Sequence, residues 1–356
     1  MGSVKSLRVI RPPGVEPGYG IWTFGDRYSV FNLKRMPDLI PGAGAARAMM
    51  GAATMEMVEA RGIPTTYRGM VDGNDDDCRV GSLREPSAEM MITLLHVHEP
   101  PFADGRYDYA SYEQGRGTLD NYVVPLELIF RNGLPAGSSI LERLEQLKSR
   151  SDTAAVTRLM ADLGLEKFPA PGTMLPTPYC DITTKFEADD RPVTREEALR
   201  ISGLTEQDFR RAEQVRDTAN EVITARCKAL GWTHYDGKAE TVRVRGQVAL
   251  GDVAGTPDEN RIYVDGFDPT KEFLRQHHRR HQPRLLEAIR DAKAAAKIAG
   301  AKDFRPFLQA QPEPLPPEIP PLVGEVYQAM ANDYIGRRVF DVRPLGEAIE
   351  RLQEAD

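Results

Sequence analysis

The chain has 356 residues, 41% of them hydrophobic and 28% charged, a composition typical of a soluble globular protein with roughly two domains of about 150 residues. Its 53 acidic and 46 basic residues give a formal net charge of −7, which argues against a protein that mainly coats nucleic acid. The longest apolar run, at residues 90–95, is far shorter than the ~20 residues that cross a bilayer, so we expect no membrane span.

The first sixty residues predict a small sheet followed by a helix. Apolar residues between positions 7 and 33 are separated by Pro12-Pro13-Gly14 and Pro17-Gly18, and this spacing predicts short antiparallel strands near residues 7–10, 21–24 and 28–31. Residues 44–60 are rich in Ala and Met, contain no Pro and precede Gly62. This segment therefore predicts a packed helix, with its methionines in the core.

The second half of the chain carries the stronger helix signals. Thr194 with Glu197, and Thr205 with Asp208, have the spacing of helix N-caps, and apolar residues recur at helical spacing up to Leu230. Two alternating runs, 241–245 and 247–250, predict an antiparallel pair that turns at Gly246. Residues 283–299 predict a further helix, 312–321 a stiff Pro-rich linker, and 345–353 a last short helix.

Several common sites are excluded by inspection. The sequence has no Walker A motif, no complete G-x-G-x-x-G fingerprint, no H-E-x-x-H and no G-x-S-x-G. His277, His278 and His281 surround Arg279 and Arg280. Because the arginines would repel a metal ion, we interpret this segment as a solvated basic patch.

One group of charged residues suggests phosphate chemistry. Asp236, Lys238 and Glu240 lie on one face if their segment is extended, because side chains alternate along a strand. Asp252 follows the next strand of the predicted pair, so Glu240 and Asp252 could hold Mg²⁺ while Lys238 neutralises phosphates. A surface ion pair across two strands explains the same spacing equally well, and the sequence leaves both interpretations open.

A second group suggests an anion site. An apolar segment from Pro125 ends in Arg131-Asn132 and is followed by a small-residue turn that includes Ser138 and Ser139. Arginine supplies a fork of donors, and such a turn supplies backbone N–H groups and hydroxyls. The alternative is a strand followed by a helix with Ser138 or Ser139 as its N-cap, and the two interpretations are compatible.

Five segments occur in an order that resembles a known family: residues 26–31, 36–42, 125–138, 178–185 and 236–261. Together they resemble SAICAR synthetase (phosphoribosylaminoimidazole-succinocarboxamide synthase), particularly its archaeal-type branch. The resemblance implies an α+β fold with an ATP cleft between two domains. We expect an N-terminal antiparallel-sheet, nucleotide-binding domain at 1–122, an α+β substrate and metal domain at 123–310, and a Pro-rich linker with a helical tail at 311–356.

The resemblance also implies an activity. It is the ATP-dependent joining of L-aspartate to the carboxylate of a 5-aminoimidazole or related azole ribonucleotide through an acyl phosphate, with ATP and Mg²⁺ as cofactors, as in purine biosynthesis. By matching positions, the implied residues are Lys238, Glu240 and Asp252 for catalysis; Glu240 and Asp252 for Mg²⁺; Lys5, Lys238, Val124 and Leu126 for ATP; and Arg131, Ser138, Lys185, Asp236, Arg261 and Arg275 for the substrates.

Three positions depart from the family pattern. Ser3 and Ala43 stand where lysines are usual, and Asn32 replaces an acid. These departures leave two alternatives open: a paralogue that acts on another carboxylated azole or C-nucleoside in nucleoside-antibiotic biosynthesis, and a catalytically inactive nucleotide-binding regulatory protein.

The cellular setting is inferred from cysteine usage. Cys78, Cys180 and Cys227 lie far apart and form no C-x-x-C pair, so neither a disulfide framework nor a zinc knuckle is indicated. We expect a cytoplasmic homo-oligomer whose partners are small-molecule substrates, without nucleic acid or membrane.

Overall fold

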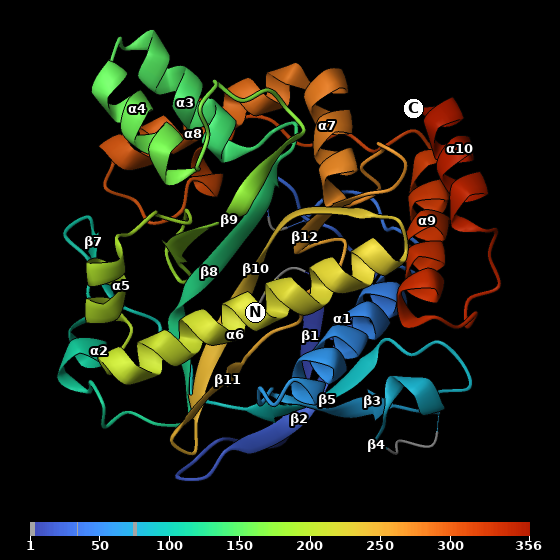
Figure 1. The fold of residues 1–356 in the computed structure, drawn as a ribbon, viewed down its shortest axis with the longest axis horizontal. Helices are drawn as coiled ribbons and strands as arrows, with labels where there is room; N and C mark the ends of the chain where they lie inside the picture. Colours follow the sequence, from blue (N-terminus) through green and yellow to red (C-terminus); the bar gives the residue numbers. More distant parts are fainter. Residues whose placement is uncertain (1–3, 34, 74–76) are drawn as a thin grey trace.

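The computed structural model describes residues 4–33, 35–73 and 77–356. Two five-stranded sheets, both antiparallel throughout, form the centre of the molecule (Figure 1). An α+β fold is thereby confirmed. In the first sheet the strand order is β1-β2-β5-β3-β4, with the bounds β1 Lys5–Arg11, β2 Gly18–Phe24, β3 Tyr67–Val71, β4 Asp77–Cys78 and β5 Glu89–Leu94.

The second sheet has the order β11-β10-β8-β9, and β12 also pairs with β10. A short hairpin, β6 Phe102–Ala103 with β7 Arg106–Tyr107, lies apart from both sheets. The two large sheets are joined by backbone contacts: Leu250 N donates to Pro64 O at 3.0 Å, and Thr66 N donates to Leu250 O at 2.9 Å. The bounds are β8 Tyr122–Leu134, β9 Thr173–Thr184, β10 Thr233–Val244, β11 Gln247–Leu250 and β12 Asn260–Tyr263.

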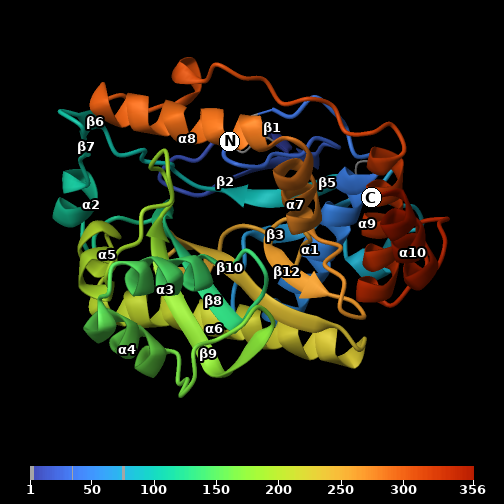
Figure 2. The same ribbon diagram turned by 90° about the horizontal axis from the view of Figure 1, so that it is seen from above.

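Two central helices cover the sheets and also touch each other (Figures 1 and 2). Helix α1, Ala43–Ala60, packs on the first sheet, and α6, Glu206–Ala229, packs on the second. The predicted caps are confirmed, because Thr194 Oγ1 accepts from Glu197 N and Thr205 Oγ1 accepts from Asp208 N. The other helices are α2 Ala110–Gln114, α3 Ser139–Ser149, α4 Thr153–Asp162, α5 Arg195–Ile201, α7 Lys271–His281, α8 Pro283–Ile298, α9 Ile319–Ile335 and α10 Leu345–Ala355.

The prediction of a strand at 28–31 is wrong. Phe31 and Asn32 have φ values of 56° and 59°, in the left-handed region that a pleated strand does not use. Tyr28 and Val30 are nevertheless buried. The apolar spacing of residues 28–31 therefore indicated correctly that side chains here are buried, but wrongly that they lie in a strand.

The tail, residues 311–356, contains a helix that the sequence did not predict. Residues 319–335, partly assigned to a stiff linker, form helix α9, and Pro320 and Pro321 lie in its first turn. Proline is tolerated there because the first N–H groups of a helix have no intrahelical partner. Helix α9 packs on α1, and α10 packs on α9, so the tail belongs to the same buried apolar cluster as both sheets. The domain boundaries near residues 122 and 310 stay predictions.

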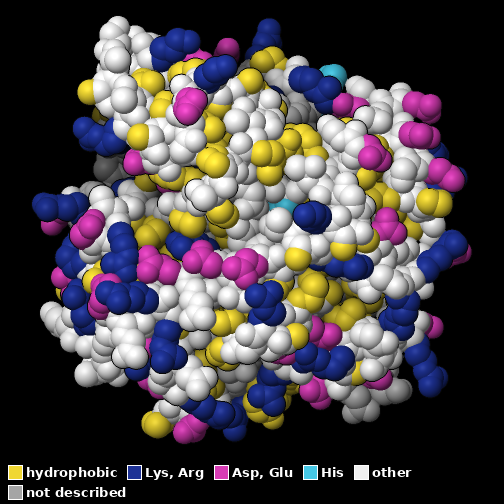
Figure 3. Space-filling view, viewed as in Figure 1, with side chains coloured by type: hydrophobic (Ala, Val, Ile, Leu, Met, Phe, Trp, Pro, Cys, Tyr) yellow, Lys and Arg dark blue, Asp and Glu magenta, His cyan; other side chains and the backbone are white. Residues whose placement is uncertain are grey.

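The surface seen in Figure 3 carries Lys and Arg side chains mixed with Asp and Glu, without one large basic area. Among the described residues, no helix is both long and apolar enough to cross a membrane.

Candidate active site

Four antiparallel strands place polar side chains on one face of the second sheet. Asp236 lies opposite Arg131 on β8 and Arg261 on β12, and Glu240 lies opposite Glu127 on β8. Directly opposed residues in antiparallel strands share a face. The expectation that Asp236, Lys238 and Glu240 share a face within a strand is therefore confirmed.

β10 changes partners beside these residues. β12 pairs with its first half, up to Gly237, and β11 pairs with its second half, from Thr241. Between the two pairings, the chain from Gly251 to Glu259 runs past β10, and Gly251 N donates to Glu240 O at 2.8 Å. This change of partner places Glu259 within 3.3 Å of the Lys238 ammonium group.

We call the resulting group the carboxylate–lysine cluster. Lys238 Nζ lies 2.7 Å from Glu127 Oε1 and 3.5 Å from Glu240 Oε1. Lys185, the residue that follows β9, forms an ion pair with Glu240. Within the described residues, the cluster has four carboxylates and three ammonium groups: Glu127, Glu240, Asp252, Glu259, Lys5, Lys185 and Lys238.

Lys5 brings the first sheet into the cluster. It lies at the start of β1, forms an ion pair with Asp252, and its Nζ lies 4.3 Å from the centre of the Trp22 ring. Asp252 comes from the segment that follows β11 in the second sheet. The cluster is therefore assembled from both sheets, as expected for a site between two lobes.

Charges and burial in the cluster give two facing carboxyl groups very different pKa values. Burial opposes ionisation of Glu240, but Lys185 and Lys238 hold its pKa at about 2. Burial raises the pKa of Glu127 to about 7, with Lys238 acting against this rise and Glu240 reinforcing it. The carboxyl groups of Glu127 and Glu259 were not singled out from the sequence, because strand register and loop path bring them to Lys238.

These residues fit a hard divalent cation. Mg²⁺ prefers oxygen ligands and commonly uses one or two protein carboxylates together with phosphate oxygens. Glu240 is ionised, because its pKa lies at about 2. Asp252 lies near Lys185, the lysine that pairs with Glu240, and in spite of burial the charges of both carboxylates raise the pKa of Lys185. Lysine ammonium groups occupy both carboxylates here, so a bound cation would replace them as the positive partner.

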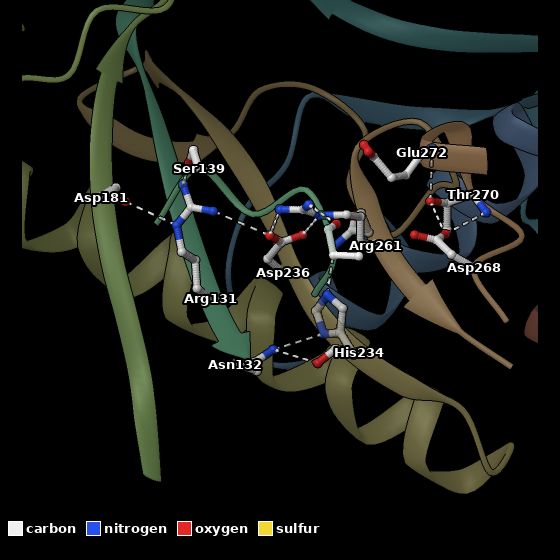
Figure 4. Close-up of polar contacts among 12 residues, drawn as sticks. Arg131, Asn132, Ser139, Asp181, His234, Asp236, Arg261, Asp268, Thr270 and Glu272 are labelled. Carbon is white, nitrogen blue, oxygen red and sulfur yellow. Dashed lines mark hydrogen bonds and ion pairs between the residues drawn. The ribbon is translucent and has the colours of Figure 1, made fainter. Parts of the chain in front are cut away.

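The second group, which we call the arginine–aspartate cluster, begins two residues before Lys238 (Figure 4). Arg261 Nε donates to Asp236 Oδ1 at 2.9 Å, and a second donor of Arg261 reaches the other oxygen. Arg131 Nε donates to Asp181 Oδ2 at 3.1 Å, and its Nη1 lies 3.4 Å from Asp236. Two guanidinium groups thus lie beside one buried carboxylate.

The two serines in the turn after β8 have different surroundings. Arg131 Nη2 donates to Ser139 Oγ at 3.2 Å, so Ser139 is the serine that contacts the arginine. Ser138 occupies the N-cap position of α3, but its hydroxyl caps nothing and is buried without a hydrogen-bond partner. An orphaned buried hydroxyl beside a turn is suited to a ligand oxygen.

Arg275 lies further away, on α7. Its guanidinium pairs with Glu272 at 3.1 Å. Glu272 is close to the turn after β8, because a Cβ added at Gly137 would lie 2.9 Å from Glu272 Oε1. Arg275 is thus linked to this turn through Glu272, and its predicted contact with substrate stays a prediction.

Val124 and Leu126 lie in β8, and each is 1% exposed. Their side chains belong to the apolar core, so any contact with adenine at this point would have to use backbone groups. Val123 N donates to His96 O at 2.9 Å, which ties the start of β8 to the end of the first sheet. The predicted adenine contact stays a prediction.

Three positions depart from the family pattern, and the two that the structure describes, Asn32 and Ala43, lie outside both clusters. Asn32 Nδ2 donates to Asp189 Oδ1 at 3.2 Å on an exposed surface. Ala43 is fully buried at the start of α1. Ser3 is outside the described residues.

Sequence reasoning also missed a buried polar network behind the arginine–aspartate cluster. His234 Nδ1 lies 2.8 Å from Thr224 Oγ1 and 3.3 Å from Asn132 Nδ2, and its Nε2 lies 2.9 Å from Asn260 Nδ2. Burial lowers the pKa of His234 to about 4, so the ring is neutral near pH 7. The pairing of β10 with β12 shifts register between His234 and Asp236. His234 therefore contacts Asn260 and Thr224, whereas Asp236 contacts the two arginines.

Comparison with known proteins was informative over nearly the whole chain. The SAICAR synthetase family profile matches residues 14–292. A protein of Archaeoglobus fulgidus, provisionally named phosphoribosylaminoimidazole-succinocarboxamide synthase, is 34% identical over 355 residues, which is 99% of each chain.

Solved structures agree at the level of the fold. The chain resembles SAICAR synthase from Saccharomyces cerevisiae complexed with SAICAR, with a TM-score of 0.55 and 15% identity over 93% of this chain and 96% of the other. It also resembles a SAICAR synthetase in complex with ADP, with a TM-score of 0.52 and 19% identity over 85% and 97% of the two chains.

Proposed function

We propose, since the chain belongs to the SAICAR synthetase family, that it is an ATP-dependent ligase that joins L-aspartate to the carboxylate of a 5-aminoimidazole ribonucleotide. The family is one of carbon–nitrogen ligases in purine biosynthesis. The ADP complex of one structural neighbour and the SAICAR complex of another are consistent with the proposal that this chain binds the same classes of ligand.

One observation supports the proposal most strongly: β10 carries residues of both clusters. Asp236 belongs to the arginine–aspartate cluster, while Lys238 and Glu240 belong to the carboxylate–lysine cluster. Alternate residues of a strand are roughly 7 Å apart, so a carboxylate held by arginines would lie within reach of a phosphate held by lysines. Phosphoryl transfer to a carboxylate requires this proximity.

The proposed reaction has two steps. A carboxylate oxygen of the ribonucleotide attacks the γ-phosphorus of ATP, the bond to the β,γ-bridging oxygen breaks, and ADP leaves with an acyl phosphate formed. The amine of aspartate then attacks the acyl carbon, loses a proton, and displaces phosphate as the carbon–oxygen bond breaks. Mg²⁺, held by Glu240 and Asp252, would supply charge neutralisation at the phosphates.

The protein's own residues then have separate roles in the proposal. Lys5, Lys185 and Lys238 neutralise the charge of the nucleotide and of the transferring phosphoryl group. Arg131 and Arg261 bind the anionic groups of the ribonucleotide, and Asp236 fixes the orientation of both guanidinium groups. We assign the hydroxyl of Ser138 and the guanidinium of Arg275 to the same substrate.

A coupled assay for ADP tests the proposal. The purified chain, with Mg²⁺ and ATP, should release ADP over many turnovers only when the imidazole ribonucleotide carboxylate and aspartate are both present, and mass spectrometry should show the amide. If a panel of azole ribonucleotide carboxylates yields no ADP above the ATP-only rate, the proposal is wrong. The predicted homo-oligomer and cytoplasmic location remain predictions.

A further inference from the structure

Helix α7 lies near the C-terminal end of α10 (Figures 1 and 2), and a group of possible metal ligands lies where the two meet. His277 and His281 are one helical turn apart on α7, so they lie on the same side of the helix. Asp356, which follows α10, packs against them. Among the described residues, these three side chains place one donor atom each within 4.8 Å of one another.

The three donor atoms are close enough to converge on one ion. His277 Nδ1 lies 2.6 Å from Asp356 Oδ1, and the rings of His277 and His281 are 4.4 Å apart at their centres. Zinc–nitrogen and zinc–oxygen bonds of about 2.0–2.1 Å place ligand atoms of a tetrahedral site roughly 3.3 Å apart. The donors therefore need only small movements to surround an ion, with water as the fourth ligand.

The arginines between the histidines, which argued against a metal from the sequence, are both paired with carboxylates. Arg279 Nη1 lies 3.1 Å from Glu272 Oε1. Arg280 forms an ion pair with the second oxygen of Asp356, leaving Oδ1 directed at His277. A carboxylate that binds a metal through one oxygen is usually oriented by a hydrogen bond that its other oxygen accepts. His277 is also buried, contrary to the expected solvated patch.

We propose that His277, His281 and Asp356 form a binding site for a divalent transition metal of the zinc type, which fastens the end of the tail to α7. Imidazole nitrogen with a single carboxylate favours such ions over Mg²⁺. Neutral imidazole binds a metal through its unprotonated nitrogen, so the metal would take the place of the proton on His277 Nδ1 and the ring would carry its proton on Nε2 instead. The site is separate from both clusters and does not depend on the proposed function.

Titration calorimetry of the metal-stripped full chain with Zn²⁺, in excess Mg²⁺ to occupy hard-ligand sites, tests this proposal. The wild-type chain should bind one Zn²⁺ ion per chain. His281→Gln and Asp356→Asn should each weaken binding at least about tenfold. His281 is exposed, so its substitution is expected to leave the fold intact.

His98→Gln is the matched control, because it removes an exposed histidine from another part of the surface. It should bind Zn²⁺ like the wild type. Co²⁺ should give the visible absorption of a tetrahedral complex in the wild type and His98→Gln, and lose it in His281→Gln. Equal affinity in wild type and His281→Gln, or loss of binding in His98→Gln, would overturn the proposal and leave a hydrogen bond between His277 and Asp356 with the His281 ring packed beside it.

Discussion

Glu127 and Glu240 face each other across two paired strands, yet the protein shifts their pKa values in opposite directions. Lys185 and Lys238 keep Glu240 ionised in spite of its burial, with a pKa of about 2. Burial raises the pKa of Glu127 to about 7, because Lys238 only partly offsets it. A carboxylate fixed as an anion is suited to a cation, while one that titrates near pH 7 responds to changes in local charge.

Glu240→Gln should abolish most Mg²⁺-dependent turnover. The amide keeps the shape but removes the negative charge that we assign to the metal, and loss of one such electrostatic group costs on the order of 10²–10³ in kcat. Steady-state ADP release over a range of Mg²⁺ concentrations measures the effect. Glu221→Gln, at an exposed ion pair with Arg61, is the control and should keep the wild-type rate. A near-normal rate for Glu240→Gln at saturating Mg²⁺ would show that the metal lies elsewhere.

Glu127→Gln should change how stability depends on pH. Between the usual carboxyl pKa of 4.5 and the value of about 7 in the fold, the folded chain retains a proton that the unfolded chain has lost. Glu127 therefore makes a contribution to stability that falls as pH rises through this window. Urea unfolding at about pH 5 and about pH 8 should show a larger fall for wild type than for Glu127→Gln. Parallel profiles would contradict the raised pKa.

Residue patterns predicted part of this site. Alternation along a strand was sufficient to place Asp236, Lys238 and Glu240 on one face. The ion pairs of Lys185 with Glu240 and of Lys5 with Asp252 could not be inferred in this way. Lys185 follows β9 and Lys5 lies in β1, and the sequence leaves the register of these strands undetermined. The predicted role of Ser138 as a ligand residue stays a prediction, and the sequence did not indicate that Ser139 would contact Arg131.

At the scale of elements, the long strand β10 and the helix α6 that packs behind it hold the site in place. The start of α6 depends on its N-cap, where Thr205 Oγ1 accepts from Asp208 N at 3.1 Å. Thr205→Ala should lower the free energy of unfolding by about 1 kcal/mol, because one N–H of the first turn loses its partner. Urea denaturation measures the change, and Thr205→Ser should retain most of the stability. An unchanged midpoint for Thr205→Ala would mean that the cap contributes nothing.

The contact between α9 and the segment before α1 is close. A Cβ added at Gly324 would collide with the backbone carbonyl of Pro41. Gly324→Ala should therefore destabilise the protein by about 1–3 kcal/mol, the usual cost of overpacking. Gly346→Ala, in α10 with open space around it, is the matched control and should be neutral or slightly stabilising. Thermal unfolding of both variants compares them, and equal melting temperatures would contradict this packing.

The helices were predictable to different degrees. Residues 206–229 have capping residues and a clear apolar face, so α6 followed from local sequence. The α9 helix was missed because Pro320 and Pro321 were interpreted as part of a linker. Nothing local distinguishes prolines in a first turn from prolines in an extended linker until the following apolar residues are known to pack on α1.

At the scale of the molecule, one apolar cluster runs through both sheets and the tail helices. A chain that stops at residue 310 should therefore fail to fold cooperatively, because it uncovers the face of α1 that α9 buries. A chain that stops at Arg343 loses only α10 and should fold with a lower melting temperature. Solubility, circular dichroism and thermal unfolding distinguish these cases. A folded, soluble 1–310 chain would show that the tail is dispensable.

The change of partners along β10 has a consequence for how such a protein can diverge. Asp252 and Glu259 both come from the short segment between β11 and β12, whereas Arg131 comes from β8 and Arg261 from β12 itself. If the proposed function holds, mutations in the connecting segment change how the nucleotide is bound without touching the guanidinium groups. Under the same proposal, mutations around α3 and α7 alter the choice of acceptor while the phosphoryl donor stays the same. Substrate choice and phosphoryl donation would then diverge separately during evolution, with β10 as the element that both must keep.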